Sequence, residues 1–158
     1  MEKDYSIYVT TQPTWSFVSA VRDKVKEELK EYDKEIVESG EIAASELIEN
    51  AIKYGVSSED APVVEFKFKN ENKKIEICVV NGIESIGSIH TLIAFMEKIK
   101  NVTNKQELYI ERLREILEQP THTRSQLGLY RILYETEFDL TYEVKGNKLT
   151  VWAIRIIN

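Results

Sequence analysis

The sequence predicts an α+β fold in which helices cover one face of a single mixed, mostly antiparallel β-sheet. Segments 63–69 and 74–81 alternate or run apolar around a polar turn, which is the pattern of a β-hairpin. A second hairpin is predicted from 138–144 and 148–157, around Lys145-Gly-Asn147. Helical patterns occur in pairs before and between these hairpins. Segregated hairpins and helices are typical of a two-layer α+β sandwich.

The N-terminal half begins with a short predicted strand at 5–9, where strand-forming residues alternate. Thr14 can cap a helix that starts at Trp15. Its apolar stripe recurs at intervals of three and four residues: Phe17, Val18, Val21, Val25 and Leu29. A second helix is predicted from about Lys34 to Tyr54, and Gly40 inside it marks either a kink or a point of close packing.

Two further helices are predicted after the first hairpin. The first spans 86–101, and its inward set is Ile89, Leu92, Ile93, Met96 and Ile99. The second runs from a cap within 103–107 to about Glu118, with the apolar set Leu108, Ile110, Leu113, Ile116 and Leu117. A polar loop at 119–125 and a short helix at 127–134 then lead into the closing hairpin.

Composition restricts the class of protein. A chain of 158 residues suits one domain, 1–158, with a substantial core. The net charge of −6 gives no support for a nucleic-acid partner. No apolar run approaches the about 20 residues of a membrane helix, and the N-terminus lacks the pattern of a signal peptide. Cys78 is the one cysteine, which excludes an intrachain disulfide and favours a cytoplasmic protein.

The stretch Ile42–Gly55 contains the most informative pattern. Glu46 and Asn50 are four residues apart, so they project from one helix face on successive turns. A carboxylate and an amide in this arrangement can share a bound metal ion or water. The alternative interpretation is a buried amphipathic helix with a polar rim, whose apolar face contains Ile42, Leu47, Ala51 and Tyr54.

The run Glu46-Leu-x-x-Asn50-Ala-x-Lys53-Tyr54-Gly55 resembles the N-box of the GHKL ATPase superfamily, which includes histidine kinases and anti-sigma-factor serine kinases. That superfamily has a Bergerat-type fold with the same order of elements. The resemblance implies that Glu46 orients or activates water or an acceptor hydroxyl, and that Asn50 binds the magnesium of Mg-ATP. It also implies that Lys53 contacts a phosphate, although Lys53 is equally well read as a surface residue.

The glycine motifs of that superfamily are only partly present. Its Asp-x-Gly-x-Gly motif, whose Asp binds the adenine amino group, corresponds to the segment 79–87. Aligning Gly82 with the first motif glycine puts Val80 at the Asp position, whereas a shift of one residue puts Asn81 there. Either alignment weakens the adenine contact, because a missing hydrogen-bond partner costs about 1–3 kcal/mol.

The later Gly-x-Gly-Leu motif keeps Gly128 and Leu129 but has Gln126 at its first glycine. In the superfamily this motif opens a helix whose backbone N–H groups face the phosphates. The resemblance further implies that Arg124 contacts a phosphate and that Thr150 lies near the adenine. Read without the resemblance, these two are an ordinary loop arginine and an ordinary strand threonine.

Within the superfamily the chain is most similar to anti-sigma-factor serine kinases and to SiaB-like partner-switching kinases. The resemblance implies an ATP-binding regulator that phosphorylates or sequesters a small antagonist or sigma-factor-like protein, with homodimerisation as a further analogy. Protein serine/threonine kinase activity stays open. The alternative is a catalytically inactive member that binds its partner without ATP, and a third hypothesis is a structural domain outside the superfamily.

Overall fold

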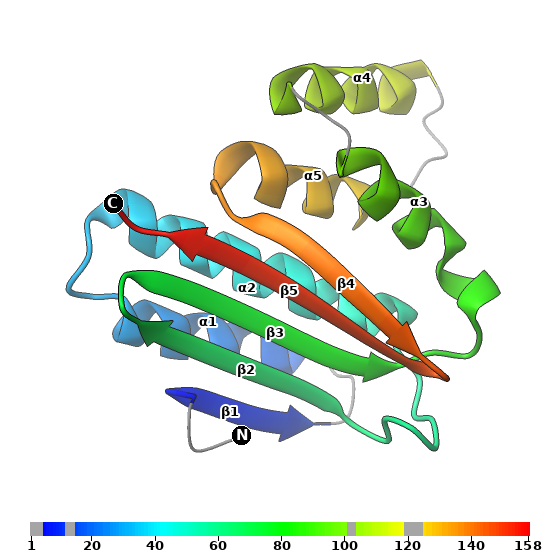
Figure 1. Ribbon diagram of the computed structural model, residues 1–158, viewed down its shortest axis with the longest axis horizontal. Helices are drawn as coiled ribbons and strands as arrows, with labels where there is room; N and C mark the ends of the chain where they lie inside the picture. The colour runs from blue at the N-terminus through cyan, green and yellow to red at the C-terminus, as the bar shows by residue number, and fades with distance from the viewer. Residues whose placement is uncertain (1–4, 12–14, 101–103, 119–124) are drawn as a thin grey trace.

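The computed structural model describes residues 5–11, 15–100, 104–118 and 125–158, which form an α+β fold with one open five-stranded sheet (Figure 1). The strands are β1 (Ile7–Thr11), β2 (Val64–Glu71), β3 (Lys74–Gly82), β4 (Asp139–Lys145) and β5 (Lys148–Ile156). The helices are α1 (Ser16–Glu28), α2 (Lys34–Tyr54), the 3-10 helix η2 (Ile86–Ile89), α3 (His90–Ile99), α4 (Lys105–Glu118) and α5 (Ser125–Glu135).

The sheet has the strand order β1-β2-β3-β5-β4, and each of its four pairings is antiparallel. The expectation of a mixed sheet is therefore wrong for the described residues. Each hairpin supplies one antiparallel pair, and β5 joins β3 in the opposite direction, so no parallel pair arises. Figure 1 shows α1 and α2 behind the sheet, and α4 standing away from it above α3 and α5. None of the described helices is long and apolar enough to cross a membrane.

The predicted helices and strands are present, with two differences. The helix predicted at 86–101 begins instead as η2, because Ser85 and Ser88 form a reciprocal capping box that starts a tighter turn. The apolar set predicted for α4 is only partly inward, since Leu108 is buried and Ile110 is exposed. Thr14, the predicted cap of α1, lies outside the described residues.

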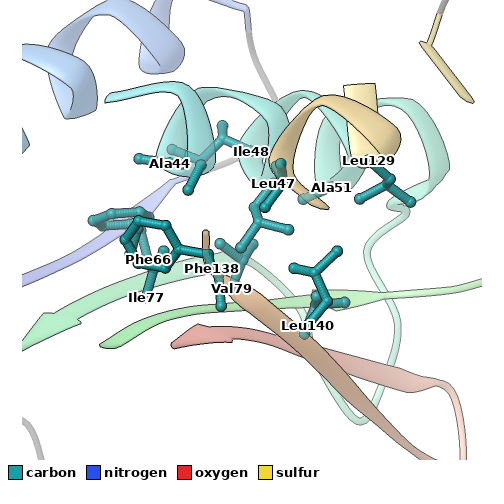
Figure 2. Close-up of a cluster of buried hydrophobic side chains, with 14 of the residues drawn as sticks. Ala44, Leu47, Ile48, Ala51, Phe66, Ile77, Val79, Leu129, Phe138 and Leu140 are labelled. Atoms are coloured by element: carbon teal, nitrogen blue, oxygen red, sulfur yellow. The ribbon is translucent and has the colours of Figure 1, made fainter. Parts of the chain in front are cut away.

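The core lies between α2 and the sheet. Figure 2 shows side chains of α2, among them Ala44, Leu47, Ile48 and Ala51, directed at β2 and β3. The largest fully buried side chains of this core are Phe66, Phe68 and Phe138, of which Phe66 and Phe138 lie opposite α2 in Figure 2. Ile42, which the spacing placed on the same face, is only partly buried and lies on the outer side of α2.

Gly40 is a point of close packing rather than a kink, because α2 runs without interruption from Lys34 to Tyr54. A Cβ atom at this position would lie 2.4 Å from Cδ1 of Leu29, which is fully buried at the end of α1. A glycine here therefore leaves room for the Leu29 side chain and lets α1 and α2 approach each other closely.

Arg155, near the end of β5, forms an ion pair with Glu35 at the beginning of α2. Its Nη1 and Nη2 donate to the two carboxylate oxygens of Glu35 at 2.7 and 2.8 Å, and Nη1 also donates to the carbonyl of Thr136. The hydrogen bonds from Arg155 and Ser39 hold the pKa of Glu35 well below its usual range, at about 2. Such a bidentate contact fixes the orientation of the two side chains as well as the distance between them.

Candidate functional site

The candidate site lies at the C-terminal half of α2, where α5 crosses above the ends of the central strands. A small cavity of about 10 Å³ is present there. Most of its lining is apolar: Leu47, Ala51, Val79, Leu92, Leu129, Leu149 and Val151. The two polar side chains that line it are Asn50 of α2 and Asn81 of β3. These residues are 31 positions apart in the sequence (81 minus 50), and the fold brings them to one place.

Asn81 lies on the sheet face that α2 covers. Along β3, Val79 belongs to the core under α2, whereas Cys78 and Val80 pack with Ala61 and Trp152 on the opposite face. Because side chains alternate along a strand, Asn81 shares the face of Val79. Of the two alignments left open by the sequence, the one that uses Asn81 therefore puts a polar side chain at the cavity, and the one that uses Val80 does not.

Both asparagines have one end of the amide fixed. Nδ2 of Asn50 donates to the backbone carbonyl of Glu46 at 3.0 Å, and Nδ2 of Asn81 donates to the carbonyl of Gly82 at 2.9 Å. No donor within the described part of the chain is bonded to Oδ1 of either residue. Two amide oxygens are thus available as acceptors at a cavity that is otherwise apolar.

Glu46 contacts α5 instead of the cavity. Its Oε1 accepts a hydrogen bond from Nη1 of Arg131 at 3.2 Å, and the Glu46 side chain is 13% exposed. A Cβ atom on Gly128 would lie 1.9 Å from Oε2 of Glu46. Any side chain at position 128 would therefore displace the Glu46 carboxylate. The predicted pair of Glu46 and Asn50 consequently does not line one common cavity, since the two side chains face different spaces.

The carboxyl group of Glu46 has a pKa raised to about 6. Burial is the main cause, the neighbouring carboxyl of Glu49 adds to it, and the Arg131 guanidinium partly offsets both. A carboxyl that titrates near neutral pH is suited to accept or release a proton.

The other predicted site residues lie elsewhere. Lys53 is exposed on α2, with Nζ 5.2 Å from the ring centroid of Tyr54, and it does not line the cavity. Thr150 is paired with Val80 across the β3–β5 ladder, so its side chain lies on the face opposite to the cavity. Arg124 lies outside the described residues.

The two motif glycines are explained by packing within the chain. A Cβ on Gly82 would come within 2.6 Å of the carbonyl oxygens of Val56 and Ala61 and of Oγ of Ser58. Gly82 therefore allows the loop after α2 to cross the end of β3. Leu129, the neighbour of Gly128, is buried and forms part of the cavity wall near Ala51 (Figure 2).

Arg131 is the residue that the sequence analysis missed. It follows Gly128 by three positions in α5, so both face α2 on the same side of the helix. Nε of Arg131 also donates to Glu135 at 2.8 Å, which fixes the guanidinium between two carboxylates. The helical spacing from Gly128 was the available indication, but it required knowing which face of α5 meets α2.

Comparison with models of known protein families and with curated proteins gives no match. Within the described ranges, no group of three or more histidine, cysteine, aspartate or glutamate residues could hold a metal ion.

Proposed function

We propose that this protein is a nucleotide-binding regulator of the anti-sigma or partner-switching type, built on a Bergerat-type fold. The observation that supports the proposal most is the meeting of Asn50 and Asn81 at one cavity. The two residues correspond to separate motifs, one for magnesium and one for adenine, and each has an available amide oxygen. Leu129, from a third motif, lines the same cavity, whereas its neighbour Gly128 faces Glu46.

The two amide oxygens have the chemistry needed to bind Mg-ATP. An amide oxygen such as Oδ1 of Asn50 is a suitable ligand for the hard Mg²⁺ ion, alongside phosphate oxygens. Oδ1 of Asn81 can accept a hydrogen bond from the adenine amino group. The space fits only after a rearrangement, because the cavity holds about 10 Å³ whereas small-molecule sites are typically about 300–1,000 Å³.

The smallest rearrangement moves the first turns of α5, with Leu129, away from α2. Exposing the Leu129 side chain costs about 1.5–3 kcal/mol. Separating the partly exposed pair of Glu46 and Arg131 adds up to about 1 kcal/mol. The sum of about 1.5–4 kcal/mol weakens nucleotide affinity by roughly one to three powers of ten relative to an open site. We therefore expect binding in the micromolar to millimolar range.

When bound, Mg-ATP would supply its γ-phosphoryl group to a hydroxyl of a partner protein and leave as ADP. Asn50 would hold the metal and Asn81 would orient the base. Glu46 would accept the hydrogen bond of the attacking Ser or Thr hydroxyl, and its raised pKa suits that task. For this role Glu46 must be released from Arg131, which the same movement of α5 achieves. The partner suggested by the resemblance is a small antagonist or sigma-factor-like protein.

Calorimetric titration with ATP and ADP, with and without magnesium, tests the proposal. We expect magnesium-dependent binding that Asn50→Ala weakens at least about tenfold, since a metal ligand is lost. Thr150→Val is the matched control, because its side chain lies on the opposite sheet face and should leave affinity unchanged. If Asn50→Ala binds nucleotide as the unmodified protein does, the assigned site is wrong.

A second candidate function is an interaction module that binds its partner without nucleotide. The size of the cavity favours it, as does the fact that packing alone accounts for Gly82 and Gly128. An undiminished complex with the partner in nucleotide-free buffer containing EDTA, together with no binding at millimolar ATP, would support this function over the first.

A further inference from the structure

A groove of about 320 Å³ runs along the outer side of α2, between α1 and α5. Glu38, Ile42, Ser45 and Glu49 form its floor at intervals of four, three and four residues, so they follow one line along the helix. At 1.5 Å per residue this line is roughly 16 Å long, or about three helical turns. The groove is distinct from the small cavity lined by Asn50 and Asn81, and it is long enough to hold a short helix.

The walls of the groove combine a small apolar centre with charged ends. Val18 of α1 lies with Ile42, and both are only partly buried. Arg131 of α5 lies in the groove next to Glu46. An apolar centre with polar surroundings is the arrangement that receives the apolar side of an amphipathic helix.

Carboxylates outnumber cations in the lining. It contains four glutamates and two arginines, Arg22 and Arg131. Arg131 is shared between Glu46 and Glu135, and Lys34 reaches Glu38 from outside at 3.7 Å. Among the described residues, no ion pair engages Glu41 or Glu49. The carboxyl of Glu49 lies instead close to that of Glu46, whose negative charge it disfavours.

We propose that this groove binds a basic amphipathic helix of a partner protein. Lysine or arginine side chains of that helix would pair with Glu41 and Glu49, and a small apolar side chain would contact Val18 and Ile42. Charge complementarity identifies the occupant, since a neutral or acidic helix would leave these carboxylates uncompensated. Glu46 is among the residues that line the groove, so a docked segment lies beside the carboxylate proposed to act on a hydroxyl.

This inference names the partner class for the proposed regulatory function, but it rests on the groove and not on the nucleotide cavity. It is tested without nucleotide. The probe is a 17-residue alanine-based helical peptide with lysines four residues apart on one side and a leucine between them. A peptide in which glutamate replaces each lysine is the control ligand. Binding is followed at low salt by amide chemical-shift changes in NMR spectra of the labelled protein.

We expect the lysine peptide to shift resonances of α1, α2 and the adjoining turn of α5, and the glutamate peptide to shift none. The double variant Glu41→Gln/Glu49→Gln should weaken binding about fivefold, the loss expected for two partly exposed charge pairs. Glu59→Gln/Glu84→Gln carries the same change of net charge at exposed positions outside the groove and should bind like the unmodified protein.

Three results would overturn the inference. These are no shifts with 1 mM lysine peptide, equal weakening by both double variants, and shifts that map outside the groove. A concentration-dependent dimer abolished by Glu41→Gln/Glu49→Gln, without peptide binding, would instead assign the groove to a second copy of the chain. Failure of the proposed nucleotide function is seen separately, because it changes the ATP titration and leaves the peptide result as it is.

Discussion

The contact between Gly128 and Glu46 leads to a prediction in which two opposing effects have similar size. Replacing Gly128 by alanine inside α5 should favour the helix by about 1 kcal/mol, because alanine has the higher helix propensity. The new methyl group would, however, meet Oε2 of Glu46 at 1.9 Å and Cδ at 2.9 Å. The side chain of Glu46 must then turn away from α5.

The cost of that movement has two parts. Extra volume in a packed site costs about 1–3 kcal/mol, and the lower end applies because the end of a side chain can move more easily than backbone. The ion pair with Arg131 contributes up to about 1 kcal/mol more. Gly128→Ala should therefore destabilise the protein by about 0–1 kcal/mol. In a Glu46→Ala background both costs vanish, and the same substitution should stabilise by about 1 kcal/mol.

A double-mutant cycle measures this difference. Urea unfolding of the unmodified protein, both single variants and the double variant should give a coupling free energy of about 1–2 kcal/mol between the two positions. Equal slopes of the four unfolding curves would show that the denatured states are comparable. If Gly128→Ala stabilises both backgrounds equally, with coupling under about 0.5 kcal/mol, the close approach of α5 and α2 described above is incorrect.

Three further predictions concern pH and the cavity. The pKa of Glu35 is lowered to about 2 by Arg155, so the stabilising effect of its charge is complete above pH 4.5 and is lost as the pH falls through 2. In urea unfolding, Glu35→Gln should therefore lower the free energy of unfolding by about 1 kcal/mol at pH 7 and by little at pH 2. The pKa of Glu46 is raised to about 6, so its charge destabilises the fold fully above pH 6 and not at all below pH 4.5. Glu46→Gln should therefore raise the unfolding midpoint more at pH 8 than at pH 4.5. An equal effect at both pH values would contradict the burial of this carboxyl. Leu129→Ala should destabilise the fold by about 2–5 kcal/mol while strengthening binding of a fluorescent ATP analogue about tenfold, because opening the site no longer exposes the Leu129 side chain. Weaker binding would argue against a site closed by Leu129.

The elements of this fold follow from local patterns. Alternation in 63–69 and the polar turn after it predict β2 and its hairpin with β3, and the turn residues Asn72 and Lys73 do adopt positive φ. The stripe from Phe17 to Leu29 predicts α1 in the same way. Such features depend on residues close in sequence, so the sequence contains them directly.

The site was predictable only in part. Glu46 and Asn50 were found because they lie on one helix, but the sequence analysis expected them to act on one ligand from a shared face. In the structure Asn50 lines the cavity and Glu46 contacts α5, since a small rotation around the helix axis separates the two surroundings. Thr150 was expected near the adenine, yet strand alternation places it on the other side of the sheet.

The sequence by itself determined the helices, the hairpins and the N-box-like run, because these rest on periodicities of two and of three to four residues. Tertiary structure alone decided that Asn81 rather than Val80 faces α2, that Gly128 leaves room for the carboxylate of Glu46, and that Arg131 pairs with it. Each of these facts depends on the relative placement of elements that are dozens of residues apart. That placement is set by packing of the shared core, which no local pattern encodes.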